Sequence, residues 1–196
     1  IVIYPSVDPL KKFPKKENLI SFVGKLNRSK GFNLFGNSII KILKKYTNWT
    51  CIVNGDEPRE VYNFKHKNLK YKGWISHAKT LKIYSKTSIS LIPSTWTEPF
   101  GRTAMEAASR GCATIVSKKG GLVETVNDAI FLTELSESEI FNKIKYLIEN
   151  DKARIKIQKK SFNNVLHKLK SNSRKIDEYR NEIFKNFNFS IKKDKK

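Results

Sequence analysis

STWTEPFGRTAME, residues 94–106, joins a predicted strand to a predicted helix and carries two glutamates separated by seven residues. The preceding residues 88–93 are typical of a buried strand, and residues 104–110 have the small side chains of a closely packed helix. Glu98 lies on the loop at the carboxyl end of the strand, where open α/β sheets bind ligands, and Glu106 lies in the first turns of the helix. The two carboxylates can therefore face one crevice, beside a helix start whose free N–H groups suit phosphates or sugar hydroxyls.

Strand signals and helix signals alternate on both sides of this stretch. Apolar runs predict strands at residues 19–23, 50–53, 69–71, 89–92, 114–116 and 129–132. Helical spacing predicts helices at residues 32–46, 77–84, 137–148, 152–169 and 174–187, followed by a frayed basic tail at 191–196. Ser136 and Glu139 form a capping box at the start of the third of these helices. The alternation is typical of an α/β fold with a Rossmann-like open parallel sheet, helices on both faces and additional C-terminal helices.

The chain has 196 residues, which is enough for one α/β core with a helical extension and too few for two full-sized domains. We expect the α/β domain at residues 15–150 and a helical extension with a basic tail at residues 151–196. The formal net charge is +21, and residues 151–196 supply about half of this excess. Such a charge raises affinity for anionic membranes, nucleic acids and phosphorylated ligands without choosing among them.

Cysteine usage and hydropathy exclude several classes of protein. Cys51 and Cys112 lie in apolar runs without CxxC spacing or clustered histidines, so we expect buried, reduced thiols and no zinc site. No apolar run is long enough for a transmembrane helix, and no signal peptide precedes the first strand. We expect a cytoplasmic chain, with peripheral contact at the inner face of the membrane as an option. Met105 is the only methionine, which indicates a domain or fragment of a longer protein.

Two further loops combine glycines with cations. GKLNRSKG, residues 24–31, follows the first predicted strand and places Lys25, Arg28 and Lys30 near the carboxyl ends of the strands. Glycine permits close backbone approach and lysine adds positive charge, so a diphosphate is a suitable ligand. The spacing fits neither a Walker A motif nor GxGxxG, and a purely structural basic turn is the alternative. For KKGGLVE, residues 118–124, a turn dictated by glycine with solvated lysines is the simpler interpretation.

Aromatic and histidine residues add weaker signals. Trp74 and Trp96 follow predicted strands, where an indole can stack on a base or sugar, although packing is the more common role. His77 is better explained as a helix-start residue than as a general base. His66 and His167 have no partner at a spacing that indicates a site.

The motifs together resemble the C-terminal, nucleotide-sugar-binding domain of the family 4 (group 1) glycosyltransferases, retaining enzymes of the two-domain GT-B architecture. The Glu-x7-Glu motif at residues 98–106 is the most specific element. Further segments occur in the family's order: VGKL at 23–26, KG at 30–31, GD at 55–56, GWIS at 73–76 and GGLVE at 120–124. The resemblance covers residues 19–150 and implies a nucleotide-sugar donor as the ligand.

The resemblance implies a role for each matching residue. Glu106 would bind the ribose hydroxyls, and Glu98 would bind hydroxyls of the donor sugar near the reacting carbon. Lys30, which with Glu98 is expected to act in catalysis, would neutralise the diphosphate leaving group together with Lys25. The family commonly has arginine where Lys25 stands, so bidentate phosphate binding is lost there, and Arg28 is a candidate to compensate for it.

Other donor contacts are implied in the same way. Backbone N–H groups around Phe100 and Gly101 would contact the sugar, and Thr103 would contact the distal phosphate. The remaining donor contacts would be made by Gly24, Trp74, Ile75 and Arg102. The cations take the place of a metal ion, so we expect neither a metal nor another cofactor.

The resemblance further implies transfer with retention, through an oxocarbenium-like displacement on one face of the sugar. A covalent intermediate on Glu98 is the less favoured alternative, and a glycosidase-type pair is rejected because Glu106 is better used in binding ribose. The family's acceptor-binding N-terminal domain is missing from this chain, and residues 1–14 resemble the end of the interdomain linker. We therefore expect donor binding without catalysis by this chain, in a protein of envelope polysaccharide or lipopolysaccharide assembly.

Two other functions stay open. A non-catalytic basic module that binds an anionic membrane or polymer would explain the charge but not the ordered motifs. A GT-B nucleotide-sugar epimerase or a phosphorylase-like relative would keep the fold, but the Pro-Phe-Gly insert between Glu98 and Glu106 favours a transferase. We expect no nucleic-acid partner, and the base, the sugar, the acceptor and the oligomeric state are left open.

Overall fold

A computed structural model describes residues 5–7, 10–126 and 128–193, and its sheet consists of parallel strands in the order β3-β2-β1-β4-β5-β6. The strands are β1 Glu17–Val23, β2 Thr50–Asn54, β3 Leu69–Tyr71, β4 Thr87–Ile92, β5 Ala113–Ser117 and β6 Ile130–Leu132. This arrangement confirms the Rossmann-like open sheet predicted from the sequence. The strand order reverses between β1 and β4, and ligands of such sheets bind outside the carboxyl ends of the strands at that point.

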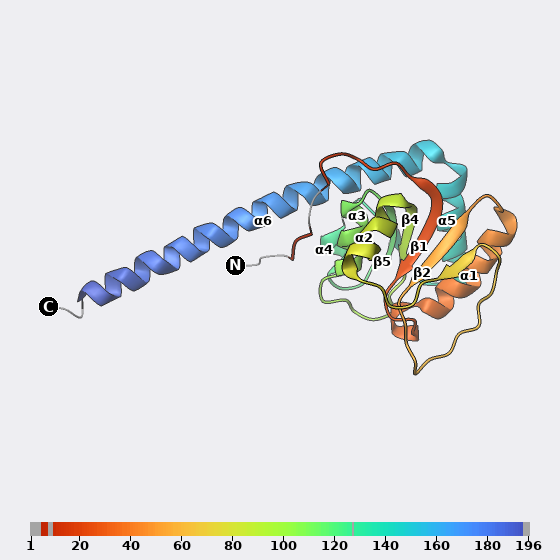
Figure 1. The fold of residues 1–196 in the computed structure, drawn as a ribbon, viewed down its shortest axis with the longest axis horizontal. Helices are drawn as coiled ribbons and strands as arrows, with labels where there is room; N and C mark the ends of the chain where they lie inside the picture. Colours follow the sequence, from red (N-terminus) through yellow and green to blue (C-terminus); the bar gives the residue numbers. More distant parts are fainter. Residues whose placement is uncertain (1–4, 8–9, 127, 194–196) are drawn as a thin grey trace.

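Helices cover both faces of the sheet (Figure 1). On one face, α1 Phe32–Lys45 packs against α5 Glu137–Glu149. On the other face, α2 His77–Lys86 packs against α3 Arg102–Ser109, which also contacts the short α4 Leu122–Thr125. Because both faces are covered, every residue of the central strand β4 is buried.

The core beneath α1 and α5 is built from aromatic and branched aliphatic side chains. Phe22 of β1 packs against Phe32 and Phe35 of α1, with ring centroids 5.0 and 4.9 Å apart. Ile89 of β4 and Ile115 of β5 are fully buried in the same cluster. Each such side chain contributes roughly 1.5–3 kcal/mol through burial, which makes this half of the domain a rigid support for the loops at the sheet edge.

Lys16 ties together the C-terminal ends of α2 and α3. Its Nζ donates to three carbonyl oxygens there, those of Tyr84 at 3.0 Å, Ser85 at 3.2 Å and Arg110 at 2.5 Å. A cation is favourable at a helix C-terminus because of the helix dipole. Burial lowers the pKa of the Lys16 ammonium, and the three carbonyls provide the hydrogen bonds that a buried cation needs. The contact helps to fix α2 relative to α3, both of which contribute to the site described below.

The C-terminal extension differs from the prediction. The prediction of separate helices at residues 152–169 and 174–187 is wrong, because one helix, α6 Asp151–Lys193, spans both ranges. Residues 170–173 are Lys-Ser-Asn-Ser, which weaken a helix but include no glycine or proline that would end it. Residues 191–193 of the predicted frayed tail belong to α6, and residues 194–196 lie outside the described residues. Figure 1 shows α6 crossing the domain and continuing well beyond it.

The N-cap of α5 and the buried cysteines agree with the sequence predictions, but the reciprocal half of the predicted capping box does not form. Ser136 caps α5 by accepting from the Glu139 N–H at 3.1 Å, although the Glu139 carboxylate accepts from the backbone of residues 133–135 rather than from Ser136. Cys51 and Cys112 are buried free thiols, and burial raises the pKa of Cys112 to about 11. Of the helices in the described residues, none has the length and apolar character required to span a membrane.

Candidate functional site

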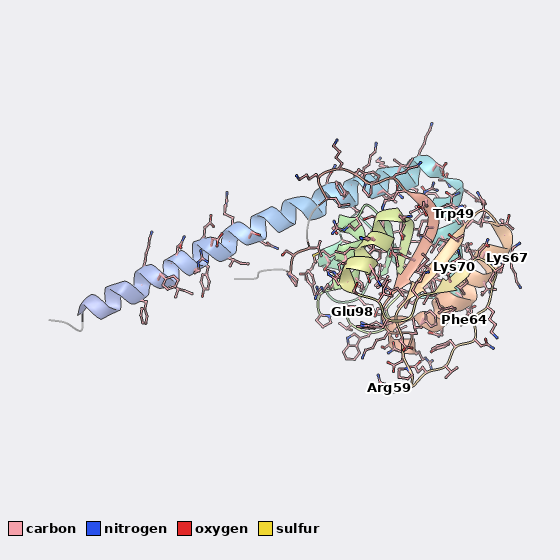
Figure 2. All side chains as sticks on the ribbon, in the orientation of Figure 1. Trp49, Arg59, Phe64, Lys67, Lys70 and Glu98 are labelled. Atoms are coloured by element: carbon pink, nitrogen blue, oxygen red, sulfur yellow. The ribbon has the colours of Figure 1, made fainter. Side chains whose placement is uncertain are left out.

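A cleft of about 290 Å³ lies at the carboxyl ends of β1 and β2, beside the starts of α2 and α3. Five residues of the predicted donor site line it: Gly24, Trp74, Ile75, Thr103 and Glu106. Figure 2 shows Glu98 and Arg59 at this end of the domain and Trp49 at the opposite end. The other predicted site residues, Lys25, Lys30, Glu98, Phe100, Gly101 and Arg102, belong to the neighbouring loops and the first turn of α3 rather than to the lining.

The floor of the cleft depends on two glycines in van der Waals contact. Gly24 follows β1, and Gly55 follows β2 with a φ of 146°, a conformation that is strained for any other residue. A Cβ atom on Gly55 would lie 1.8 Å from the carbonyl oxygen of Gly24. Because Gly55 has no side chain, the loops after β1 and β2 can lie in contact, and the cleft above Gly24 and Gly55 stays open.

Glu106 is buried in the first turns of α3, with its side chain only 6% exposed. His77 Nε2, at the start of α2, and Arg102 Nε, one turn earlier on α3, each lie 3.0 Å from Glu106 Oε1. Beneath them, burial and then the charge of Glu106 raise the pKa of Tyr84 well above its ordinary value, so its phenol stays neutral. The site thus holds a partnered carboxylate at the wall of the cleft.

Glu98 is held by a different set of partners. Lys30 Nζ lies 2.5 Å from Glu98 Oε1, and Ser94 Oγ donates to the same oxygen at 2.7 Å. The Glu98 side chain is 12% exposed and that of Lys30 is 32% exposed, so the pair borders solvent. The structure therefore brings together the two residues that the resemblance assigns to catalysis.

The turn at residues 118–124 supports the Glu98 loop. The N–H of Gly121 donates to the Glu98 carbonyl at 2.7 Å. Gly120 has a φ of 55°, and a Cβ atom there would lie 2.3 Å from the same carbonyl oxygen. These contacts agree with the interpretation of residues 118–124 as a turn dictated by glycine, because Gly120 and Gly121 allow the loop that carries Glu98 to approach closely.

The N-terminus of α3 lies between the two glutamates. Its N-cap is Gly101, which has no side chain to accept from the first N–H groups of the helix, including those of Arg102 and Thr103. A helix N-terminus carries the positive end of the helix dipole, which attracts anions. This arrangement can bind an anion such as a phosphate between Glu98 and the cleft.

Two glutamates of the loop after β2, Glu57 and Glu60, contact the loop that carries Lys25 and Lys30, which the sequence did not indicate. Glu57 accepts from Asn27 Nδ2 at 3.5 Å. Glu57 accepts from Arg59 Nε and Nη2 at 2.6 and 2.8 Å, and these hydrogen bonds lower the pKa of Glu57 to about 2. Glu60 accepts from the backbone N–H of Arg28 at 2.9 Å. The loop after β2 therefore restrains the loop after β1.

The sequence did not predict the contact of His77 with Glu106, and it left both stacking and packing open for the two tryptophans. Packing is the more common role of tryptophans after strands, but Trp74 and Trp96 are 80% and 59% exposed, so neither indole is buried. His77 starts α2 as expected, but it also contacts Glu106 across 29 residues of sequence. No local pattern encodes that contact. Within residues 5–7, 10–126 and 128–193, no three His, Cys, Asp or Glu side chains cluster as metal ligands.

Residues 8–164 match the family described as glycosyl transferases group 1. The chain belongs to this family. Its sheet with flanking helices is one half of a GT-B fold, as in the C-terminal domain of the group 1 glycosyl transferase LpcC from Francisella tularensis. That structure has a TM-score of 0.68 and 28% identity, and the similarity covers 85% of this chain and 95% of LpcC's domain. The structure of Anabaena Alr3699/HepE in complex with UDP-glucose has the same fold, with a TM-score of 0.66 and 18% identity over 83% of this chain and 49% of HepE.

Curated relatives of this group 1 domain are glycosyltransferases of several kinds. An uncharacterized glycosyltransferase of Methanocaldococcus jannaschii is 29% identical over 58% of this chain and 30% of its own length. The glycogen synthase of Aquifex aeolicus is 31% identical over 56% of this chain and 24% of its own length. A lipopolysaccharide core biosynthesis mannosyltransferase of Rhizobium leguminosarum bv. viciae is 27% identical over 56% of this chain and 34% of its own length. The match thus spans about a quarter to a third of the length of these relatives.

Proposed function

We propose that this group 1 domain binds a nucleoside diphosphate sugar and presents it for transfer to an acceptor with retention of anomeric configuration. The observation that carries the proposal is the placement of Glu98 and Glu106 on either side of the α3 N-terminus, beside a cleft. A donor of this class has three parts in sequence, namely a nucleoside, a diphosphate and a sugar. The site offers a suitable group for each part.

The nucleoside would occupy the cleft. Glu106 would accept hydrogen bonds from the ribose hydroxyls, while the exposed ring of Trp74 and the backbone of Ile75 would border the base. The glycine floor formed by Gly24 and Gly55 gives the ribose room to approach the backbone. The complex of HepE with UDP-glucose supports a nucleotide sugar as the ligand of this fold.

The diphosphate would lie over the start of α3. Thr103 and the adjoining backbone N–H groups would bind the distal phosphate, and Lys30 and Lys25 would neutralise it as the anomeric bond breaks. The contacts of Glu57 with Asn27 and of Glu60 with Arg28 would keep the loop with these lysines in place. We propose this cationic site without a metal cofactor.

The sugar would lie near Glu98, with N–H groups around Phe100 and Gly101 beside it. Lys30 and Ser94 both engage Oε1 of Glu98, which favours a carboxylate that binds and orients hydroxyls over one that attacks carbon. We therefore favour displacement on one face of the sugar, through an oxocarbenium-like transition state. The acceptor would be bound by another domain of a longer protein, and this chain alone would bind the donor without turnover.

The biological setting we propose is the assembly of an envelope polysaccharide or lipopolysaccharide. One relative is a lipopolysaccharide core mannosyltransferase, which supports this setting. A net charge of +21 also suits peripheral contact with an anionic membrane. Sedimentation with vesicles that contain 30 mol% phosphatidylglycerol tests that contact. We expect the protein to sediment with these vesicles, and to do so less as the salt concentration rises. Sedimentation of the same fraction of protein with neutral vesicles would contradict the membrane contact.

Calorimetric titration with uridine, guanosine and adenosine diphosphates and their sugars, at two salt concentrations, tests the proposed function. We expect selective binding of one nucleotide, reduced at least about tenfold by Glu106→Ala. Glu182→Ala on α6 is the control, because it removes the same charge outside the site. Equal affinity for all the nucleotides, together with loss of binding at the higher salt concentration, would instead support a basic module that binds anionic surfaces.

A further inference from the structure

Two side chains from two helices converge on one oxygen of Glu106. His77 is the first residue of α2 and Arg102 the first residue of α3, and both donate to Oε1 at 3.0 Å. Arg102 and Glu106 are one turn apart on the same helix, so their pairing is local. The contact of His77 with Glu106 instead depends on the packing of α2 against α3.

The other oxygen of Glu106 is available to a ligand. Among the residues that the structure describes, no hydrogen bond is made to Oε2, while Glu106 lines the cleft. An ionised carboxylate oxygen accepts hydrogen bonds and cannot donate them. Because His77 and Arg102 occupy Oε1 from two directions, the carboxylate plane is restrained and Oε2 keeps one orientation.

Neither helix capping nor packing in an apolar cluster explains the contact of His77 with Glu106. Ser76 already caps α2, since its hydroxyl accepts from the Lys79 N–H. The His77 side chain is 50% exposed and belongs to no apolar cluster. Arg102 alone would restrain Glu106 from one side only, because it lies one turn away on the same helix.

We propose that His77 is a positioning residue that gives the donor site its selectivity for ribonucleotides over 2′-deoxyribonucleotides. It orients Glu106 so that Oε2 meets the vicinal hydroxyls of a ribose in the cleft. This inference rests on the proposed function, because it needs a nucleoside in that cleft. His77 also lines the cleft, but we propose that it acts through Glu106 and makes no hydrogen bond to the nucleotide.

The binding experiment compares each ribonucleoside diphosphate with its 2′-deoxy form, using uridine and guanosine pairs, on the wild-type chain and on His77→Ala and His77→Gln. We expect the wild type to bind the ribonucleotide at least about tenfold more tightly, since a hydroxyl bonded to a carboxylate is then lost. His77→Ala should reduce this ratio to about threefold or less by weakening only the ribonucleotide. His77→Gln, whose amide can still donate to Glu106, should restore the ratio, and His66→Ala should leave it unchanged.

A ratio that is unchanged in His77→Ala, or equal loss of both nucleotides, would overturn the positioning role. A second measurement does not depend on nucleotide. Nitrogen-15 spectra of the histidine rings should show a proton on Nε2 of His77, and Glu106→Gln should shift that signal, which His77→Gln identifies by its loss. If no nucleotide binds but this signal is as expected, the proposed function fails although the His77–Glu106 contact is real. If nucleotides bind but the signal is insensitive to Glu106→Gln, the positioning role alone fails.

Discussion

Glu106 and Glu98 belong to one sequence motif, but the structure holds them in different ways. Glu106 is fixed by His77 and Arg102, whose donors come from two packed helices. Glu98 is engaged by Lys30 and Ser94, which lie on or beside loops. Under the proposed function, the nucleotide side of the site would be preformed by helix packing, whereas the sugar side would be held by an ion pair for which a diphosphate can compete.

The largest expected effect comes from filling the floor of the cleft. Gly55→Ala places a Cβ 1.8 Å from the Gly24 carbonyl oxygen at a φ of 146°, so we expect a loss of at least about 3 kcal/mol in the free energy of unfolding. Gly73→Ala is the matched control, because Gly73 also has a positive φ of 60° but open space around it. It should cost about 1–2 kcal/mol. Urea unfolding of both variants measures the difference, and equal losses would show that the close contact is unimportant.

A smaller effect is expected on the sugar side. Lys30→Ala removes the cation that Glu98 holds next to the α3 N-terminus, so affinity for a nucleoside diphosphate should fall about tenfold. Affinity for the free nucleoside should stay the same, because Lys30 does not line the cleft. Lys152→Ala on α6 is the control for charge. If the nucleoside and the diphosphate weaken equally, Lys30 supports the fold of the loop rather than the phosphate.

The smallest effect concerns Glu57, in the loop after β2. Arg59 lowers the pKa of Glu57 from 4.5 to about 2, so the folded state binds the proton less tightly than the unfolded state does. The resulting stability is complete above about pH 4.5 and is lost as the pH falls through about 2. Urea midpoints between pH 5 and pH 2 should therefore fall less steeply for Glu57→Gln than for the wild type. Parallel curves for the two proteins would show that the pair contributes nothing.

The sequence predicted the strands and the positions of the two glutamates, but not the partners that hold these glutamates. The bounds predicted for β3 agree with the structure and those of the other strands agree within two residues, because short apolar runs between turn residues are local signals. The placement of Glu98 and Glu106 near the same helix start followed from their spacing on a strand-loop-helix unit. The sequence could not show how these residues are held, since that depends on which helices and loops pack together.

The features that the sequence did not predict have different physical origins. His77 meets Glu106 only after α2 docks on α3, and Glu57 meets Arg59 in a loop without periodicity. The predicted break in α6 failed for a different reason, since weak helix formers at 170–173 do not end a helix without a glycine or proline.

The most direct test of the account is titration of the preferred nucleoside diphosphate and its sugar into the wild type, Glu106→Ala and Glu98→Ala. We predict that Glu106→Ala weakens both ligands at least about tenfold, because both contain the ribose. Glu98→Ala should bind the nucleoside diphosphate as tightly as the wild type or more tightly, since Lys30 is released, and should lose only the preference for the sugar. Wild-type affinity in Glu106→Ala, or the same loss of nucleotide in both variants, would contradict the division of the site into a nucleotide side and a sugar side.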